Sequence, residues 1–260
     1  MGKVILLTGG SSGIGKETCL YLANKYKIYQ MSRRKIDLPG VISLQGDITS
    51  SEDIKRIKKE IHDNGDTVEI LINNAGFGIS GSAEFTTKEE INRQLNVNFV
   101  GLCEITSEFL EDIRNNQGKI ISISSVAGVI AIPFQSFYSA SKSALNAYTL
   151  ALANELRPFK VGVSALMLGD TKTGFTASRD KQNRGDDIYK GVIDKSVSKM
   201  EKDEQNGSDA IKVSKKIEKL IKKKHIKPLY TVGFSYKLLV ILSRILPVRL
   251  VNYIVSKLYA

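Results

Sequence analysis

Histidine and cysteine are scarce in this chain, and their scarcity excludes several kinds of site. The 260 residues include two cysteines and two histidines. Cys19 and Cys103 lie far apart in the sequence, so no disulfide framework is expected, and their number fits a reducing compartment such as the cytoplasm. Neither histidine lies near a motif. A histidine-based catalytic triad and a histidine-rich zinc site are therefore not expected, and no metal is predicted.

Acidic residues are nearly missing from the last fifth of the chain. Residues 211–260 hold twelve lysines and arginines and one acid, Glu218, so this part carries a net charge of +11, equal to that of the whole chain. The basic run at 212–227 contains no recognised nucleic-acid-binding motif, and nucleic acid is not expected as a partner. The apolar run at the N-terminus is too short for a signal peptide.

The apolar stretch 234–258 allows two interpretations. It is interrupted by Arg244, Pro247 and Arg249, which argues against a transmembrane helix. In the favoured interpretation, C-terminal helices pack on the domain. They would bury five apolar side chains there, namely Leu238, Leu239, Leu242, Ile245 and Leu246. In the other, an interfacial amphipathic tail makes weak peripheral contact with anionic lipid.

A glycine-rich turn stands at the start of the chain. Val4–Leu7 is a short apolar run that predicts a buried strand, and the glycine-rich residues 8–15 follow directly. Residues 16–25 then show helical spacing of apolar side chains. A strand, glycine turn and helix in this order present free backbone N–H groups to a phosphate. Glycine is needed because a side chain would block the pyrophosphate, so the turn predicts dinucleotide binding.

Strand-like and helix-like stretches alternate along the chain. The strands are expected at 3–8, 27–31, 41–45, 68–73, 118–124 and 161–168, and the helices at 13–25, 51–63, 87–114 and 136–157. This order predicts an α/β, doubly wound Rossmann fold with a mostly or wholly parallel central sheet and extra C-terminal helices. Cofactors bind at the carboxyl ends of the strands in such sheets. The glycine and polar motifs of this chain follow strands or open helices.

The end of the second expected strand indicates which cofactor is bound. A carboxylate about 20 residues after the glycines is typical of NAD-binding folds. Here the chain instead reads Met31-Ser32-Arg33-Arg34-Lys35. An arginine binds a 2′-phosphate that an acid would repel, so Arg33 favours NADP(H). Asp37, a few residues further on, is a competing carboxylate.

Tyr138 and Lys142 are the most informative pair in the sequence. They share one face of an expected helix, after an apolar run that ends at Ser125. A free phenol is a weak acid near neutral pH, but a neighbouring ammonium favours tyrosinate. Tyr138 is thus predicted to donate the proton in a carbonyl reduction. Ser125, preferred over its neighbour Ser124, is predicted to donate to the developing oxyanion.

These motifs together resemble those of the classical short-chain dehydrogenase/reductase family. The match covers about residues 3–232. It comprises Thr8-Gly9-x3-Gly13-Ile14-Gly15, Asn73-Asn74-Ala75-Gly76, Asn96-Val97-Asn98 and Ser125…Tyr138-x3-Lys142. The segment Tyr230-Thr231-Val232-Gly233 and the apolar helices after it resemble, more weakly, the 17β-hydroxysteroid and retinol dehydrogenase branch. That branch handles bulky apolar alcohols and ketones.

The resemblance implies a complete set of site residues. The catalytic residues would be Asn98, Ser125, Tyr138 and Lys142, with Asn98 and Lys142 linking the tyrosine to solvent through water. Asn98 would hold its water through a local distortion of the helix that carries it. The cofactor-binding residues would be Gly9, Ser11, Ser12, Gly13, Ile14, Gly15, Arg33, Arg34, Asp47, Ile48, Asn74, Ala75, Gly76, Tyr138, Lys142, Thr171 and Thr173. Where the family has Pro-Gly-x3-Thr, this chain has Leu168-Gly169-x3-Thr173. Leucine replaces the proline, which leaves the backbone less restricted.

We therefore expect an NADP(H)-dependent oxidoreductase that interconverts an apolar ketone or aldehyde and its alcohol. Residues 1–233 would form one domain with a substrate lid at 174–209, followed by a helical extension at 234–260. A homodimer or homotetramer is expected. The alternatives are an NAD-dependent hydroxysteroid-type dehydrogenase and a non-catalytic dinucleotide sensor or scaffold. The complete catalytic set disfavours the last, because a sensor needs no proton relay.

Overall fold

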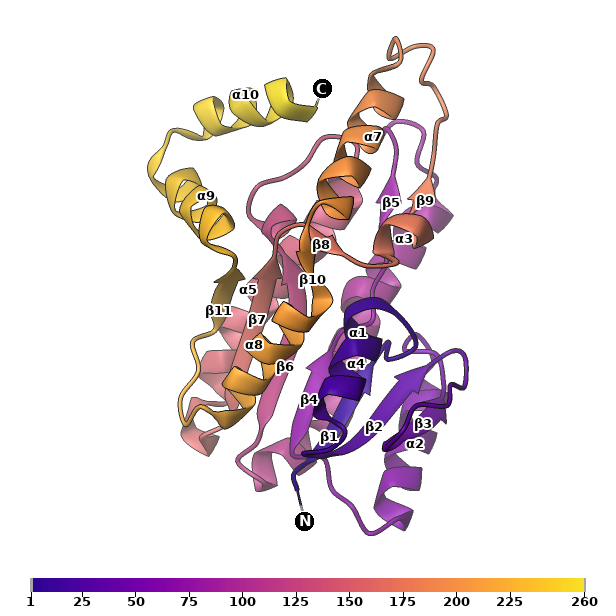
Figure 1. Cartoon of the computed structure of the whole chain (residues 1–260), viewed down its shortest axis with the longest axis vertical. Coiled ribbons are helices and arrows are strands. Elements are labelled where there is room, and N and C mark those ends of the chain that lie inside the picture. Colours follow the sequence, from indigo (N-terminus) through magenta and orange to yellow (C-terminus); the bar gives the residue numbers. More distant parts are fainter. Residues whose placement is uncertain (1, 260) are drawn as a thin grey trace.

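A seven-stranded parallel sheet forms the centre of the protein (Figure 1). The structure is a computed structural model that describes residues 2–259. The strands are β1 (Val4–Thr8), β2 (Lys27–Ser32), β3 (Val41–Gln45), β4 (Ile70–Asn73), β6 (Lys119–Ser125), β7 (Gly162–Leu168) and β11 (Leu229–Val232). They are arranged in the order β11-β7-β6-β4-β1-β2-β3. The doubly wound α/β fold predicted from the sequence is confirmed. The edge strand β11 was not predicted, because its four half-buried residues form no apolar run.

Helices cover both faces of the sheet. On one face lie α1 (Gly13–Leu22) and α8 (Ala210–Lys222), and on the other lie α2 (Ser51–Asp63), α4 (Gly101–Asn115) and α5 (Ser136–Glu155). Alternation along β1 divides its apolar side chains between the two cores: Ile5 and Leu7 pack beneath α1 and α8, and Leu6 packs on the opposite side. The basic run of the sequence falls partly on α8, which buries Val213 and Ile217.

The helix expected at 87–114 is interrupted. It consists of α3 (Lys88–Leu95), a π-helical segment (Asn96–Val100) and α4. Apolar spacing alone does not reveal the extra residue of a π turn, but the resemblance to the family implied a local helix distortion at Asn98, and the structure confirms it. π turns inside helices are frequently found at functional sites, and this one carries the buried side chain of Asn98.

The segment expected as a lid folds over the carboxyl edge of the sheet. It contains α6 (Phe175–Ser178), β9 (Asp180–Lys181) and α7 (Val192–Gln205). β9 pairs with β5 (Ile79–Ser80), and β10 (Ser208–Asp209) pairs with β8 (Thr171–Lys172). Ion pairs join Arg93 to Asp180 and Arg184 to Glu90. The β5 pairing and the two ion pairs fasten the segment to β5 and α3.

Two short helices end the chain, α9 (Phe234–Ile245) and α10 (Val248–Tyr259). They lie at one side of the molecule, where α9 contacts β11 and α10 contacts α7 (Figure 1). The predicted burial of their leucines was wrong: Leu238, Leu239, Leu242 and Ile245 are 38–73% exposed, and Leu246 is half-buried. The buried side chains of the pair are Val240 and Val255. No helix in the described part of the chain is long and apolar enough to cross a membrane.

Candidate active site

The glycines of the turn between β1 and α1 allow neighbouring segments of backbone to approach closely. Gly9 has φ +73°, and a Cβ added to it would lie 2.9 Å from Cα of Ala75. A Cβ on Gly15 would overlap the carbonyl oxygen of Gly9. Ser12 occupies the N-cap of α1, and within residues 2–259 no side chain caps the first turn. The cradle therefore fits a dinucleotide pyrophosphate, with N–H groups at the helix N-terminus directed toward it.

The end of β4 is tied to the glycine turn by hydrogen bonds. Nδ2 of Asn74 donates to the carbonyl oxygens of Thr8 and Gly9 at 3.0 and 3.1 Å. The hydroxyl oxygen of Thr8 accepts from the backbone N–H groups of Asn74 and Ala75, each at 3.0 Å. These bonds hold the Asn74-Ala75-Gly76 segment, which the sequence predicted to bind the cofactor, beside the turn.

Asn98 is fully buried in the π-helical segment. Its Oδ1 accepts from N–H of Phe77 at 3.0 Å, and its Nδ2 donates to the Phe77 carbonyl oxygen at 2.9 Å and to Oγ of Ser141 at 3.1 Å. Asn98 thus joins the loop after β4 to α5, the helix that carries Tyr138. A Cβ on Gly76 would lie 3.2 Å from Asn98 Oδ1 and 3.7 Å from Lys142 Nζ, so both side chains flank this glycine.

The two serines at the end of β6 have different environments. The hydroxyl of Ser124 donates to Oδ1 of Asn146 at 2.7 Å and is buried. The hydroxyl of Ser125 accepts from N–H of Ala127 at 3.1 Å and lies beside Tyr138, where its hydrogen bond lowers the tyrosine pKa. Ser125 is therefore the serine placed to act with Tyr138.

Tyr138 and Lys142 lie one helical turn apart on α5, where Lys142 is buried and Tyr138 is partly buried at the cavity. Burial raises the pKa of Tyr138 to about 12, against the smaller lowering by Ser125. Burial lowers the pKa of Lys142 to about 8, and its Nζ donates to the carbonyl oxygen of Ile123 at 2.8 Å. Nζ of Lys142 lies 5.8 Å from the centroid of the Tyr138 ring. The tyrosine pKa is thus raised in the free protein, contrary to the expected lowering, and the phenol is held in its proton-donating form.

Arginines lie where the sequence predicted the residue that distinguishes NADP(H) from NAD(H). Arg33 and Arg34 are exposed, line the cavity beside the glycine turn, and form no ion pair within residues 2–259. Asp37, the competing carboxylate, lies outside the cavity lining. Asp47 lines the cavity together with Ile48, and its Oδ1 accepts from N–H of Thr49 at 2.9 Å.

The loop after β7 carries a carboxylate into the site. Oδ2 of Asp170 accepts from the hydroxyl of Tyr236, on α9, at 2.5 Å. Burial raises the pKa of Asp170. Thr171 donates to the Gly169 carbonyl oxygen at 3.1 Å, and Thr173 lies against the glycine turn, 3.5 Å from the position of a Cβ on Gly13.

One cavity of about 1230 Å³ connects these groups at the carboxyl edge of the sheet. All the cofactor and catalytic residues implied by the sequence line it except Gly15 and Asn98, which lie behind it. The sequence missed the wall formed by the C-terminal helices. That wall consists of Tyr236, Leu239, Leu242, Ser243, Leu246, Val251, Ile254, Val255, Leu258 and Tyr259. Phe175 lines the cavity, with 5.8 Å between its ring centroid and that of Tyr138, whereas Phe134 and Phe137 do not line it.

Comparison with known proteins identifies the family. A family model described as short chain dehydrogenase matches residues 3–184. The chain is 37% identical over 228 residues to 3-ketodihydrosphingosine reductase of Bacteroides thetaiotaomicron, covering 86% of this chain and 85% of the relative. It is 36% identical over 250 residues to a probable short-chain type dehydrogenase/reductase of Helicobacter pylori, covering 93% and 92%. The chain therefore belongs to the short-chain dehydrogenase family, and the resemblance seen in its motifs is confirmed.

Solved structures show the same fold. A short-chain dehydrogenase from Streptomyces avermitilis superimposes with a TM-score of 0.83 at 23% identity, covering 92% of this chain and 91% of the other. A Burkholderia cenocepacia relative in complex with NADP matches with a TM-score of 0.73 at 22% identity, covering 93% and 92%. A Burkholderia phymatum relative in complex with NAD matches with a TM-score of 0.78 at 20% identity, covering 93% and 92%. Structural neighbours of this chain thus bind nicotinamide cofactors of both kinds.

Proposed function

We propose that this oxidoreductase uses NADPH to reduce an apolar ketone, with Tyr138 as the proton donor. One observation carries the proposal. A single cavity joins the glycine turn and Arg33 at one end to Tyr138, Ser125 and an apolar wall at the other. This is the arrangement that hydride transfer to a carbonyl requires, because cofactor, acid and substrate must meet in one place.

The cofactor would be held along the carboxyl edge of the sheet. The glycine turn would bind its pyrophosphate, the Asn74-Ala75-Gly76 segment its adenosine ribose, and Arg33 its 2′-phosphate. When bound, the nicotinamide supplies the hydride. A cationic side chain at the end of β2 supports NADP(H) over NAD(H), since the guanidinium forms charge-assisted bonds with a phosphate.

The protein's own residues would handle the proton. Tyr138 would donate its phenolic proton to the carbonyl oxygen as the carbonyl carbon gains the hydride. Ser125 would donate a hydrogen bond to the same oxygen as negative charge develops there. Lys142, beside the tyrosine and buried, would stabilise the resulting tyrosinate by its positive charge. Asn98 would fix the position of the loop at Gly76 relative to α5. With this loop fixed, water would reach Lys142.

The cavity wall supports a ketone with a long alkyl chain. Leucine, isoleucine and valine side chains of α9 and α10 line one end of the cavity, and they offer favourable burial to an alkyl chain. The Bacteroides relative is named for 3-ketodihydrosphingosine, which is a long-chain amino ketone. Asp170 fits such a compound, because this cavity-lining carboxylate has no ion-pair partner within residues 2–259 and an ammonium group would balance its charge.

A substrate panel tests the proposal. Long-chain 3-ketones with and without an adjacent amine, a short-chain ketone and a steroid ketone are mixed with the protein, and loss of NADPH or NADH absorbance is followed. We expect the fastest turnover with a long-chain ketone and NADPH. No turnover of any ketone, with either cofactor, would contradict the proposal, and preferred use of NADH would contradict its cofactor.

Assembly as a homodimer or homotetramer and a cytoplasmic location also remain predictions. Val100 and Leu150, exposed on neighbouring helical segments, support association, because apolar side chains on adjacent surfaces favour burial by a second copy. Light scattering coupled to size-exclusion chromatography measures the mass directly.

A further inference from the structure

The C-terminal helices expose an unusual share of the apolar surface. Of the seventeen large apolar side chains exposed in the described part of the chain, eleven lie between Phe234 and Leu258. On α9, four of them recur at helical spacing and form one stripe: Phe234, Leu238, Ile241 and Ile245. Phe234 is 85% exposed and Ile245 73% exposed. We call this stripe, together with Leu250 and Tyr253 of α10, the outer face.

A second apolar stripe on the same helices faces the active site. Leu239, Leu242 and Leu246 of α9 line the cavity, as do Ile254 and Leu258 of α10. None of the six residues of the outer face lines that cavity. On α9 each lining leucine directly follows a residue of the outer face, so the two stripes lie about 100° apart around the helix. The outer face and the space that reaches Tyr138 therefore lie on adjoining sides of α9.

Charge shows which kind of surface the outer face fits. The chain has no acidic residue after Glu218, and Lys237, Arg244, Arg249 and Lys257 all lie on these two helices. Cationic side chains beside an apolar stripe are the pattern of helices that lie on anionic lipid. A second copy of the chain fits poorly, because two such faces would bring only positive charges together.

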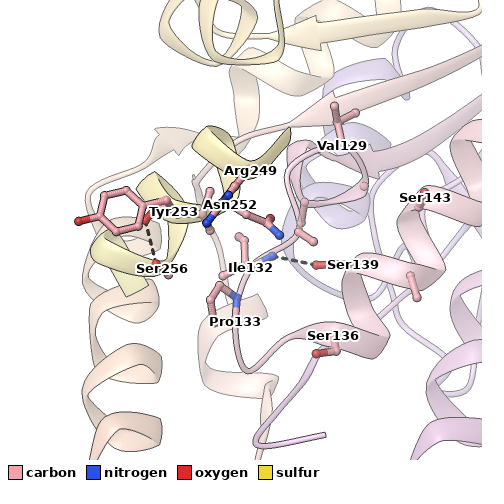
Figure 2. Close-up of a pocket in the computed structure, with 15 residues that line it drawn as sticks. Val129, Ile132, Pro133, Ser136, Ser139, Ser143, Arg249, Asn252, Tyr253 and Ser256 are labelled. Atoms are coloured by element: carbon pink, nitrogen blue, oxygen red, sulfur yellow. Dashed lines mark hydrogen bonds between the residues drawn. The ribbon is translucent and has the colours of Figure 1, made fainter. Parts of the chain in front are cut away.

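The dimensions favour lying on a bilayer. Each helix has 12 residues, or about 18 Å of length, well below the ~30 Å hydrocarbon thickness. α10 also does not pack flush against the domain. A second cavity of about 830 Å³ lies between α10 and the loop that follows β6. Figure 2 shows Arg249 and Asn252 near Ile132, with Tyr253 pointing away from it.

We propose that the outer face docks on a bilayer containing anionic phospholipid, and that the substrate passes from the lipid between α9 and α10 into the active-site cavity. This inference rests on the proposed function, because an apolar ketone with a long chain resides in lipid rather than in water. Docking through the outer face would set the cavity wall formed by α9 and α10 close to the membrane surface.

Vesicle co-sedimentation of the full chain tests the docking. Phosphatidylcholine vesicles are compared with vesicles containing about 30% phosphatidylglycerol, at about 0.05 M and about 0.5 M salt. We expect binding to the anionic vesicles that weakens with salt. The double variant Ile241→Glu/Ile245→Glu should lower the partition coefficient at least about tenfold. The matched control is Phe159→Glu, at a 46% exposed position of the short 3₁₀ helix Arg157–Phe159 before β7, and it should bind like the parent protein.

Turnover separates this inference from the proposed function. The double variant should reduce a short, water-soluble ketone at the parental rate, because its two positions lie outside the cavity. It should lose at least about tenfold in rate on a long-chain ketone embedded in anionic vesicles, in proportion to its lost binding. A parent protein that reduces soluble ketone but binds no vesicles overturns the docking and leaves the function intact. Vesicle binding without reduction of any ketone supports the docking and removes the function.

A dimer formed through the outer face would also overturn the inference. It would appear as a parent protein of twice the monomer mass that ignores vesicles and that Ile241→Glu/Ile245→Glu converts to a monomer. A circular dichroism spectrum and a melting temperature equal to those of Phe159→Glu ensure that loss of binding reflects the surface and not the fold.

Discussion

The hydroxyl of Tyr236 lies 2.5 Å from Oδ2 of Asp170 and donates to it. This bond joins α9, far along the chain, to the loop that follows β7, and both side chains line the active-site cavity. It fixes the carboxylate at the boundary between the catalytic groups and the apolar wall. The position suits the charged end of a substrate whose alkyl chain extends along α9.

Asp170→Asn should change substrate preference. The amide can still accept from Tyr236, but the negative charge is lost. We expect KM for a long-chain 2-amino ketone to rise by about 10- to 150-fold, since a charge-assisted bond contributes roughly 1.5–3 kcal/mol, while KM for the matching ketone without the amine stays nearly constant. Steady-state kinetics on the two substrates measure the difference. Equal effects on both would mean that Asp170 only supports α9.

Lys142→Met should stabilise the protein. The folded-state pKa of Lys142 is lowered from 10.5 to about 8 by burial. Below about pH 8 both folded and unfolded states carry the proton, so the folded state bears the whole cost of the buried ammonium. Between about 8 and 10.5 the folded state releases the proton first, and this cost falls as pH rises.

Chemical denaturation of the parent and the variant at two pH values measures this cost. We expect Lys142→Met to gain roughly 1–3 kcal/mol in free energy of unfolding at about pH 7, and less at about pH 9.5. Lys55→Met, at an exposed position of α2, is the control and should show no such pH-dependent gain. A variant less stable than the parent at both pH values would contradict the assigned burial cost.

Arg33→Asp should reverse the cofactor preference. A carboxylate there would repel the 2′-phosphate, and we expect KM for NADPH to rise by about 10- to 100-fold relative to KM for NADH. Lys35→Asp provides the control, because Lys35 is exposed nearby but does not line the cavity. If the two variants shift the preference equally, the effect is general surface charge and Arg33 is not the selector.

The neighbouring serines offer a matched pair. Ser125→Ala removes a donor beside Tyr138, and we expect kcat to fall by about 10²-fold with the fold unchanged. Ser124→Ala removes a buried bond to Asn146 and should cost about 1 kcal/mol of stability with little change in kcat. Kinetics and thermal melts of both variants measure the contrast. The reverse pattern would assign the oxyanion contact to Ser124.

Features that depend on local pattern were predictable from the sequence. Residues close together in the chain determine the glycine turn, the strand–helix alternation and the Tyr138–Lys142 spacing. In the structure, residues of the glycine turn line the same cavity as Tyr138 and Lys142. The pairing of Asp170 with Tyr236 spans 66 residues and leaves no periodic signal. Apolar spacing continues through the π turn around Asn98 and does not reveal it, so this distortion was predictable only from the motif that resembles the family.

The C-terminal helices show why apolar content alone misleads. Leu238 and Leu242 look like core positions in the sequence, yet their helices have two apolar stripes and little of the domain to pack against. Periodicity shows that a face is apolar, but it does not show what covers that face. Only the placement of α9 beside the cavity separates the lining stripe from the exposed one.

Tyr138→Phe tests the central claim most directly. The variant keeps the ring and its contact with Phe175 but lacks the proton donor. With NADPH and a ketone that the parent protein reduces, we expect kcat to fall by about 10²-fold or more, while NADPH affinity, measured by fluorescence titration, stays nearly unchanged. A Tyr138→Phe protein that reduces the ketone at the parental rate would contradict the assignment of Tyr138 as the acid.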